Sequence, residues 1–234
     1  MTLARERVAE WMDDPALPPV DHDAALRGLA RLNALSRCHA SLWPRVRSLA
    51  RRKGGTLHVL DVASGGADLP IRMDAVARRQ GVRLRWTLTD RSSHALRHGL
   101  ARARACGLAC KGEQVDVPGQ PLPEADLVIN SLFLHHFDRP DVVRILEAMR
   151  CAARLAVGVS DLRRTRLALG LVWLGSRTLS RSPVVRHDAT ASVRAAHQPQ
   201  EVRELADRAG LQDATVQVTD PVRWRLWWER GAAA

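Results

Sequence analysis

The stretch that decides the fold is TLHVLDVASGGADLP, residues 56–70. An apolar run reaches an acidic residue, Asp61, then passes through small residues to Asp68, which opens a helix. Small residues in such a loop let a ligand approach the backbone, and the helix N-terminus beyond supplies unpaired N–H donors. In a doubly wound α/β sheet, ligands bind at this place, outside the carboxyl ends of the strands.

The same loop does not fit the fingerprint of dinucleotide-binding proteins, G-x-G-x-x-G. Counted from Gly65, the second glycine position holds Ala67 and the third holds Pro70. The carboxylates of Asp61 and Asp68 would also repel a pyrophosphate, whereas they favour a cationic ligand.

Beyond the loop, short β-type runs alternate with helical runs, which is the pattern of βαβ units and a parallel sheet. We expect strands at 56–61, 83–89, 108–115, 126–131 and 154–160, and helices at 68–80, 91–106 and 139–151. A helix at 200–209 and two β runs joined by a tight Asp220-Pro221 turn follow, and strands so joined must be antiparallel. The sequence therefore predicts a doubly wound, mostly parallel, seven-stranded α/β sheet with an antiparallel terminal strand.

The first fifty residues and one internal segment have a helical pattern instead. We expect helices at 2–12, at 21–37, and from Ser41 to the Gly54-Gly55 pair, and an inserted helix in the apolar stretch 162–180. One structural domain then has three parts: a helical cap at 1–54, a core at 55–161 and 198–234, and an inserted helical lid at 162–197.

Composition and charge limit the kinds of binding partner and the location that we expect for this protein. The formal net charge is +11, but only Lys53 and Lys111 are lysines, and the arginines are spread along nearly every expected helix, which disfavours a nucleic-acid-binding face. No apolar stretch reaches the length of a membrane span, and the N-terminus is charged where a signal peptide would be apolar, so we expect a cytoplasmic protein without stable membrane insertion. The four cysteines form no C-x-x-C pair and are predicted to be buried thiols, with no metal site.

The loop and three later features together resemble the class I S-adenosylmethionine-dependent methyltransferases, in particular small-molecule enzymes of types 11 and 12. The first motif of that family is acid-x-Gly-x-Gly-x-Gly, and this chain has Asp61 and Gly65 but Ala63 and Ala67 at the outer glycine positions. In the order that the family requires, the second, third and fourth strands are then followed by an acid, an acid and Leu-His-His, and the resemblance covers roughly residues 56–228.

This resemblance implies S-adenosylmethionine as cofactor, whose ammonium and sulfonium groups suit the carboxylates of the loop. By position, Asp90 would bind both ribose hydroxyls and Asp116 would meet the adenine amine. The expected cofactor-binding residues are Asp61, Ala63, Ser64, Gly65, Asp68, Asp90, Arg91, Asp116, Val117 and Asn130. Structural alternatives stay open for three of them, namely helix caps at Asp68 and Asp90 and a turn at Asp116.

Methyl transfer is an in-line displacement, so the protein aligns the acceptor and, for an oxygen acceptor, removes its proton. Neighbouring parallel strands would bring His135 and His136, after the fourth strand, close to Asp161, after the fifth. The resemblance to small-molecule O-methyltransferases implies His135 as base and Asp161 as its orienter; alternatively, one histidine packs against the cofactor and the other faces solvent. A second candidate is His187, beside Asp188 in the loop expected after the inserted helix.

The inserted segment and the C-terminal tryptophans each allow more than one interpretation. With Trp173 on its apolar face, the segment could cover a hydrophobic acceptor, pack against the N-terminal helices, or touch a membrane surface, since arginines flank it. Trp224 and Trp228 share one face of the last strand and Trp227 takes the other, which favours core packing over base stacking.

Three functions are compatible with these patterns. The favoured hypothesis is O-methylation of a small, largely apolar hydroxylated acceptor of phenolic or quinone type, in secondary metabolism or quinone synthesis. An RNA methyltransferase is the alternative suggested by charge, although Asn130 is not followed by the Pro-Pro-Tyr typical of base methylation. A non-catalytic scaffold that kept the fold is the third, suggested by Ala63 and Ala67.

Overall fold

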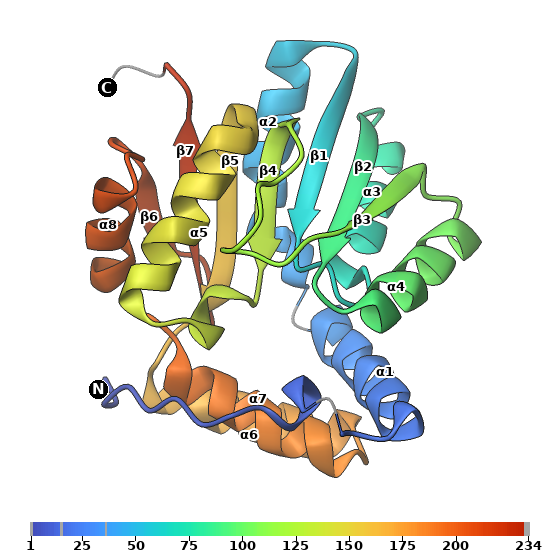
Figure 1. Cartoon of the computed structure of the whole chain (residues 1–234), viewed down its shortest axis with the longest axis vertical. Coiled ribbons are helices and arrows are strands. Elements are labelled where there is room, and N and C mark those ends of the chain that lie inside the picture. Colours follow the sequence, from blue (N-terminus) through green and yellow to red (C-terminus); the bar gives the residue numbers. More distant parts are fainter. Residues whose placement is uncertain (1, 15, 36, 232–234) are drawn as a thin grey trace.

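The computed structural model of this chain describes residues 2–14, 16–35 and 37–231 (Figure 1). A seven-stranded sheet forms the centre, in the order β3-β2-β1-β4-β5-β7-β6. Its strands are β1 (Thr56–Val62), β2 (Arg83–Asp90), β3 (Cys110–Gln114), β4 (Ala125–Ser131), β5 (Ala153–Leu162), β6 (Thr215–Val218) and β7 (Arg223–Glu229). The first five strands pair in parallel, and β7 runs antiparallel to both β5 and β6. The expected fold class, with its antiparallel terminal strand, is confirmed.

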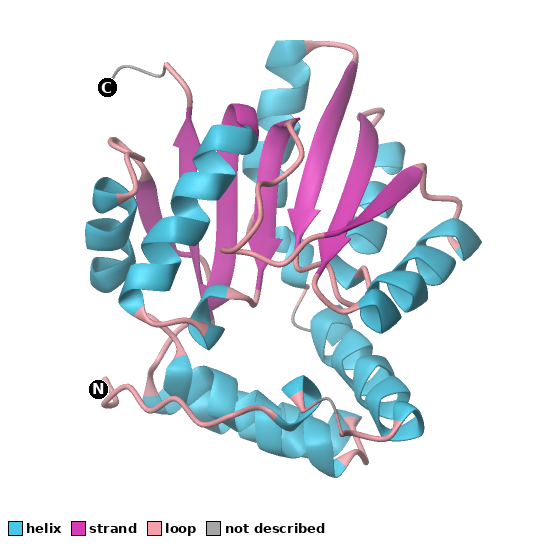
Figure 2. Ribbon diagram, viewed as in Figure 1, coloured by secondary structure: helices cyan, strands magenta, loops and turns pink. Residues whose placement is uncertain are grey.

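Helices cover both faces of this sheet (Figure 2). One face carries α2 (Trp43–Lys53), α3 (Asp68–Arg79) and α4 (Ser93–Ala105), and the other carries α5 (Arg139–Ala152) and α8 (Pro199–Arg208). Apolar side chains alternate along the strands, so that Leu57 and Val59 join one buried cluster while Leu60 and Val62 join the other. The residue pattern that predicted the strands therefore fills two cores at once.

The last strand follows the same alternation. Trp224 packs into the cluster under α5 and α8, with Trp228 against it, and Trp227 packs into the opposite cluster. The prediction that the C-terminal tryptophans are core residues is confirmed for this strand.

A third layer lies across the carboxyl ends of the parallel strands, at the lower edge of the sheet in Figure 1. It consists of α1 (Pro19–Leu35), α6 (Arg166–Leu179), α7 (Pro183–Ala195) and the N-terminal segment, which ends in the short 3-10 helix Trp11–Asp13. Two further 3-10 turns, Cys38–Ala40 and Leu134–His136, connect α1 to α2 and β4 to α5. Among the described helices, none has both the length and the apolarity needed to cross a bilayer.

Three expectations from the sequence are wrong. The segment 2–12 is not a helix but an extended strap, because distant groups bind its backbone and side chains: Leu3 N–H donates to Arg164 O, and Arg5 Nε donates to Ala195 O. Residues 187 and 188 lie within α7 and not in a loop. Finally, Cys38 is buried as expected, but Cys110 is only half-buried, and Cys106, the C-cap of α4, and Cys151, in the last turn of α5, are exposed.

Candidate active site

The loop after β1 has left-handed backbone at all three positions where the methyltransferase motif has glycine. The φ angles are 55° at Ala63, 49° at Gly65 and 59° at Ala67. A side chain in this conformation costs about 1 kcal/mol or more per residue, because Cβ crowds the carbonyl oxygen that follows. The loop thus keeps the shape of a glycine-rich loop despite two alanines.

Acidic residues of β1 and β2 lie against this loop. The carboxylate of Asp90 accepts hydrogen bonds from Gly65 N–H and from Ser92 N–H, each at 2.9 Å. Asp61 is buried, and the Ser64 hydroxyl donates to its backbone oxygen at 2.8 Å. Burial raises the pKa of Asp61 to about 8, with a smaller contribution from the charge of Asp90, so this carboxyl would release its proton to solvent when a cation binds beside it.

Asp68 is not the cap of its helix, and its carboxylate is already paired within the protein. It is the first residue of α3, whose N-cap is Ala67, and its carboxylate pairs with Arg102 Nη1 at 2.8 Å and accepts from Asn33 Nδ2 at 3.2 Å. These contacts tie α4 and α1 to the glycine loop. The helix-cap alternative for Asp68 is therefore wrong, and its role at the cofactor stays a prediction.

The remaining residues expected at the cofactor differ in their burial. Asp116 and Arg91 are exposed near the carboxyl ends of β3 and β2, and Val117 beside Asp116 is buried. Asn130 is fully buried at the end of β4, where its Nδ2 lies 3.3 Å from Met149 Sδ.

Three buried oxygens at this edge lack a hydrogen-bond partner among the described residues, and they belong to Asn130, Ser131 and Ser160 at the ends of β4 and β5. Buried polar atoms are seldom left unpaired, so this edge is suited to a polar ligand. Together with the glycine loop and the carboxylates of Asp61 and Asp90, it fits a cationic, hydroxyl-bearing cofactor.

His135 and Asp161 meet at the ends of β4 and β5, as the parallel pairing of these strands predicts. His135 Nδ1 lies 2.8 Å from Asp161 Oδ1, and the His135 backbone N–H donates to Asp161 Oδ2 at 3.2 Å. Only 3% of His135 and 1% of Asp161 are exposed. The imidazole is thus fixed in orientation by a buried carboxylate.

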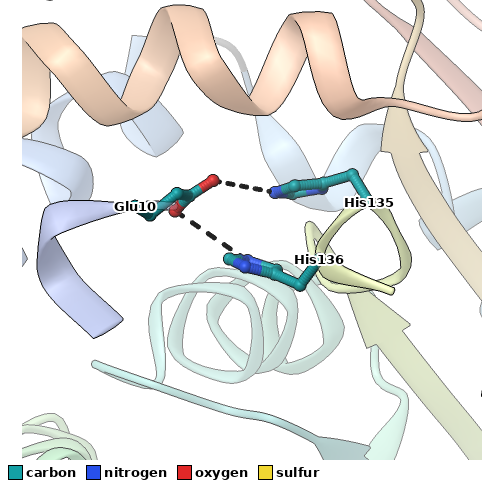
Figure 3. Close-up of side chains that lie close together, drawn as sticks. All are labelled: Glu10, His135 and His136. Carbon is teal, nitrogen blue, oxygen red and sulfur yellow. Dashed lines mark ion pairs between the residues drawn. The ribbon is translucent and has the colours of Figure 1, made fainter. Parts of the chain in front are cut away.

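A third member of this group, Glu10, comes from the N-terminal strap (Figure 3). Glu10 Oε1 lies 3.5 Å from His135 Nε2, and Glu10 Oε2 lies 3.9 Å from His136 Nε2. The two imidazoles stack with their centroids 4.4 Å apart. Sequence reasoning missed Glu10, because nothing within the first fifteen residues indicates that the segment reaches the end of β4.

The charges of this cluster favour an ion triad. Burial works against a charged His135, but Asp161 and Glu10 outweigh it and raise the pKa of His135 to about 10. Burial also disfavours charged Asp161 and Glu10, and the nearby imidazolium reverses this and lowers the pKa of both. At neutral pH the structure therefore holds a protonated imidazole between two carboxylates.

His187, the second candidate base, belongs to a different group of contacts. Its ring stacks on Trp11 at 4.3 Å, and its Nδ1 lies 2.9 Å from the carboxylate of Asp188. Asp188 also accepts from the backbone N–H groups of Trp11 and Met12. These residues fasten the N-terminal strap to α7 and do not join the His135 cluster.

Two surface hollows lie at the opposite edge of the sheet. They are lined by residues at the amino ends of the strands, among them Thr56, His58, Arg85 and Asp126. Neither contains a residue of the glycine loop or of the His135 cluster. We therefore locate the candidate site by its polar groups, under the layer formed by the strap, α1, α6 and α7.

Of the known proteins compared with this chain, only solved structures are similar to it. No protein-family model matches the chain, and the search of curated proteins gives no match. The apo form of the S-adenosylmethionine-dependent methyltransferase SibL superposes with a TM-score of 0.67 at 18% identity, covering 96% of this chain and 63% of that one. An O-methyltransferase family 2 protein from Planctomyces limnophilus, in complex with apigenin, gives 0.61 at 18% identity, covering 92% and 63%.

A third solved structure is similar over nearly its whole length. Magnesium protoporphyrin IX methyltransferase from Synechocystis, with bound S-adenosylhomocysteine, gives a TM-score of 0.57 at 16% identity and covers 93% of this chain and 90% of that one. By contrast, the chain spans less than two thirds of the length of the other two. With its strand order and its glycine-type loop after β1, this chain has the class I fold of S-adenosylmethionine-dependent methyltransferases.

Proposed function

We propose that this protein transfers a methyl group from S-adenosylmethionine to a hydroxyl of a small, largely apolar acceptor of phenolic or quinone type. The observation that carries the proposal is the buried His135–Asp161 pair, 2.8 Å apart, on the edge of the sheet that also bears the glycine-type loop. A similar structure, the family 2 protein from Planctomyces limnophilus, binds the phenol apigenin, which is in keeping with this acceptor class.

In this proposal residues at the carboxyl ends of β1, β2 and β4 would hold the donor. The loop at Gly65 lets it approach the backbone, Asp90 is the candidate for the ribose hydroxyls, and Asp61 supplies a carboxylate for the ammonium group. The donor supplies a methyl group already activated by its sulfonium. The protein's own contribution is alignment and one proton transfer.

The methyl group moves in a single displacement. A lone pair of the acceptor oxygen attacks the methyl carbon, the carbon–sulfur bond breaks with both electrons going to sulfur, and neutral S-adenosylhomocysteine leaves. The hydroxyl proton passes to Nε2 of His135, whose Nδ1–H remains bound to Asp161.

Glu10 must give way for this step. It faces the same Nε2 atom that would take the proton, and it helps to keep His135 protonated. An acceptor that displaces the carboxylate removes one of the two charges that hold the proton, so the pKa of His135 falls towards the range of a base. The proton on Nε2 then leaves to solvent or with the Glu10 carboxylate before Nε2 accepts the hydroxyl proton. Acceptor entry and movement of the N-terminal strap are therefore coupled in this proposal.

The test begins with calorimetry of S-adenosylmethionine binding, followed by methyl transfer to a panel of hydroxylated aromatic compounds. We expect binding, turnover of at least one phenol, and a loss of about 10²- to 10⁴-fold in kcat for His135→Ala with little change in donor affinity. His58→Gln, at the opposite edge of the sheet, is the matched control. No measurable donor binding would favour the scaffold hypothesis, and unchanged turnover in His135→Ala would overturn the base assignment.

A further inference from the structure

Helix α6 carries apolar side chains that the rest of the described chain leaves uncovered. Leu167, Leu171, Trp173 and Leu174 are 61%, 44%, 48% and 54% exposed, and they are half of the large hydrophobic residues found exposed in the described chain. Its opposite face is covered, since Ala168 and Ser176 are buried and α1 and α7 pack against the helix. The helix thus packs one face against the protein and turns a second, apolar face to solvent.

The exposed residues form two adjacent rows. Leu167, Leu171 and Leu174 follow one another at spacings of four and three residues, so they share one face of the helix. The neighbouring row, at the same spacings, is Arg166, Gly170, Trp173 and Arg177. The guanidinium of Arg177 lies 4.3 Å from the Trp173 ring centroid, which places a cation and an indole side by side at the border of the leucine row.

The sequence segment that contains this face carries basic residues and no acidic ones. None of the residues from Leu162 to His187 is acidic, and this stretch contains six arginines. Arg166, Arg177 and Arg181 are exposed, next to or just beyond the apolar rows. Leucines flanked by tryptophan and arginine are the composition of helices that lie in the interface of an anionic bilayer.

A second copy of the chain is a poorer occupant. A helix of 14 residues is about 21 Å long, and a stripe about 10 Å wide on it offers about 200 Å², well short of the roughly 800 Å² per partner that a stable interface buries. Two copies meeting face to face would also bring their arginines together. A lipid surface needs only a shallow, one-sided contact and supplies the opposite charge.

We propose that the exposed face of α6, defined by Leu167, Leu171, Trp173 and Leu174, binds the surface of an anionic lipid bilayer. The helix lies parallel to the membrane, with its leucines among the acyl chains and its arginines at the phosphates. Because α6 belongs to the layer over the candidate active site (Figure 1), this orientation brings the proposed acceptor site close to the compartment in which apolar molecules dissolve. The membrane contact itself stands independently of the proposed methyl transfer.

The test is flotation of the full-length protein with vesicles of phosphatidylcholine alone and of phosphatidylcholine with 30% phosphatidylglycerol. We expect binding to the anionic vesicles only, weakening as salt is added. The double variant Leu171→Ser/Leu174→Ser should lower the partition coefficient by about tenfold or more, and Arg166→Gln/Arg177→Gln by a similar factor on anionic vesicles.

Val218→Ser is the matched control, because Val218 is likewise exposed, at 51%, but belongs to β6 of the sheet and not to α6. It should bind as the unchanged protein does, and far-ultraviolet circular dichroism and the melting temperature should confirm that all variants fold. The proposal is overturned if the protein fails to float with anionic vesicles, if the leucine variant binds equally well, or if light scattering shows a dimer that the leucine changes dissociate. Loss of methyl transfer with intact vesicle binding would count against the proposed function and leave the membrane contact standing.

Discussion

Glu10 Oε1 lies 3.5 Å from His135 Nε2, although the two residues belong to segments far apart in the chain. The strap that carries Glu10 is held by Arg5, whose guanidinium donates to Phe137 O and pairs with Asp138 beside the same turn. Ser192 of α7 also donates to Glu10. The carboxylate is therefore held in place, and its charge acts on a buried imidazole.

Replacing Glu10 by glutamine should lower the pKa of His135. The change removes one of the two negative charges that outweigh burial, so the proton is held less tightly; we expect a decrease of about one unit or more. An NMR titration of the histidine ring measures the pKa, and the acid limb of the kcat/KM profile should move to lower pH by a similar amount. Glu6→Gln is the control, because Glu6 lies on the same strap and pairs with Arg194 at the surface.

Replacing Asp161 by asparagine should lower kcat by about 10²- to 10⁴-fold and leave the dissociation constant of S-adenosylmethionine within about twofold. The amide no longer fixes the tautomer of His135 or supports its positive charge. Asp141→Asn, a change on α5 where Asp141 pairs locally with Arg144, should have little effect on kcat. An equal loss of donor affinity would show that Asp161 maintains the structure of the site and does not act by supporting proton transfer at His135.

Binding of S-adenosylmethionine should strengthen as pH rises towards 8. Burial raises the pKa of Asp61 to about 8, so below that pH the carboxyl must lose its proton before it can pair with the ammonium group. We expect affinity to rise by up to about tenfold per pH unit below 8 and to level off above it. Calorimetry in buffers of different ionisation enthalpy measures the released proton, and Asp61→Asn should abolish the release.

Ala63→Gly should stabilise the fold by about 0.5 to 1 kcal/mol, because the relief of the left-handed strain exceeds the added entropy of the unfolded chain. Ala101→Gly, on the exposed side of α4, has no such strain to relieve and should destabilise by up to about 1 kcal/mol. Urea denaturation measures both. Equal effects of the two changes would argue against strain at Ala63.

Gly99→Ala should disturb the loop from the side of α4. A Cβ at Gly99 would lie 2.5 Å from the Gly65 carbonyl oxygen and 3.3 Å from Ala67 N, and these backbone atoms cannot yield without moving the loop. We expect a loss of about 1 to 3 kcal/mol in stability and weaker donor binding. Gly170→Ala on α6 is the control, since nothing lies within 4 Å of its Cβ position, and it should be neutral or stabilising.

The sequence predicted the central sheet well because the cause of each strand is local. Val, Leu and Ile form short, nearly continuous apolar runs in β1 and β4, and the helices between strands have their own periodicity. The antiparallel end of the sheet followed from the short Asp220-Pro221 turn. The meeting of His135 with Asp161 followed in turn, because β4 and β5 are parallel neighbours whose ends share one edge.

What the sequence alone determined is thus the sheet, the loop at Gly65 and the set of acidic and histidine residues at the strand ends. Only the tertiary structure decided that residues 2–12 form a strap, that Asp68 pairs with Arg102, and that Glu10 faces His135. The physical reason is the range of the interactions. Alternation and turn chemistry act between neighbours in sequence, whereas Arg5, Glu10 and Arg102 take their conformations from partners far away along the chain, which no local pattern records.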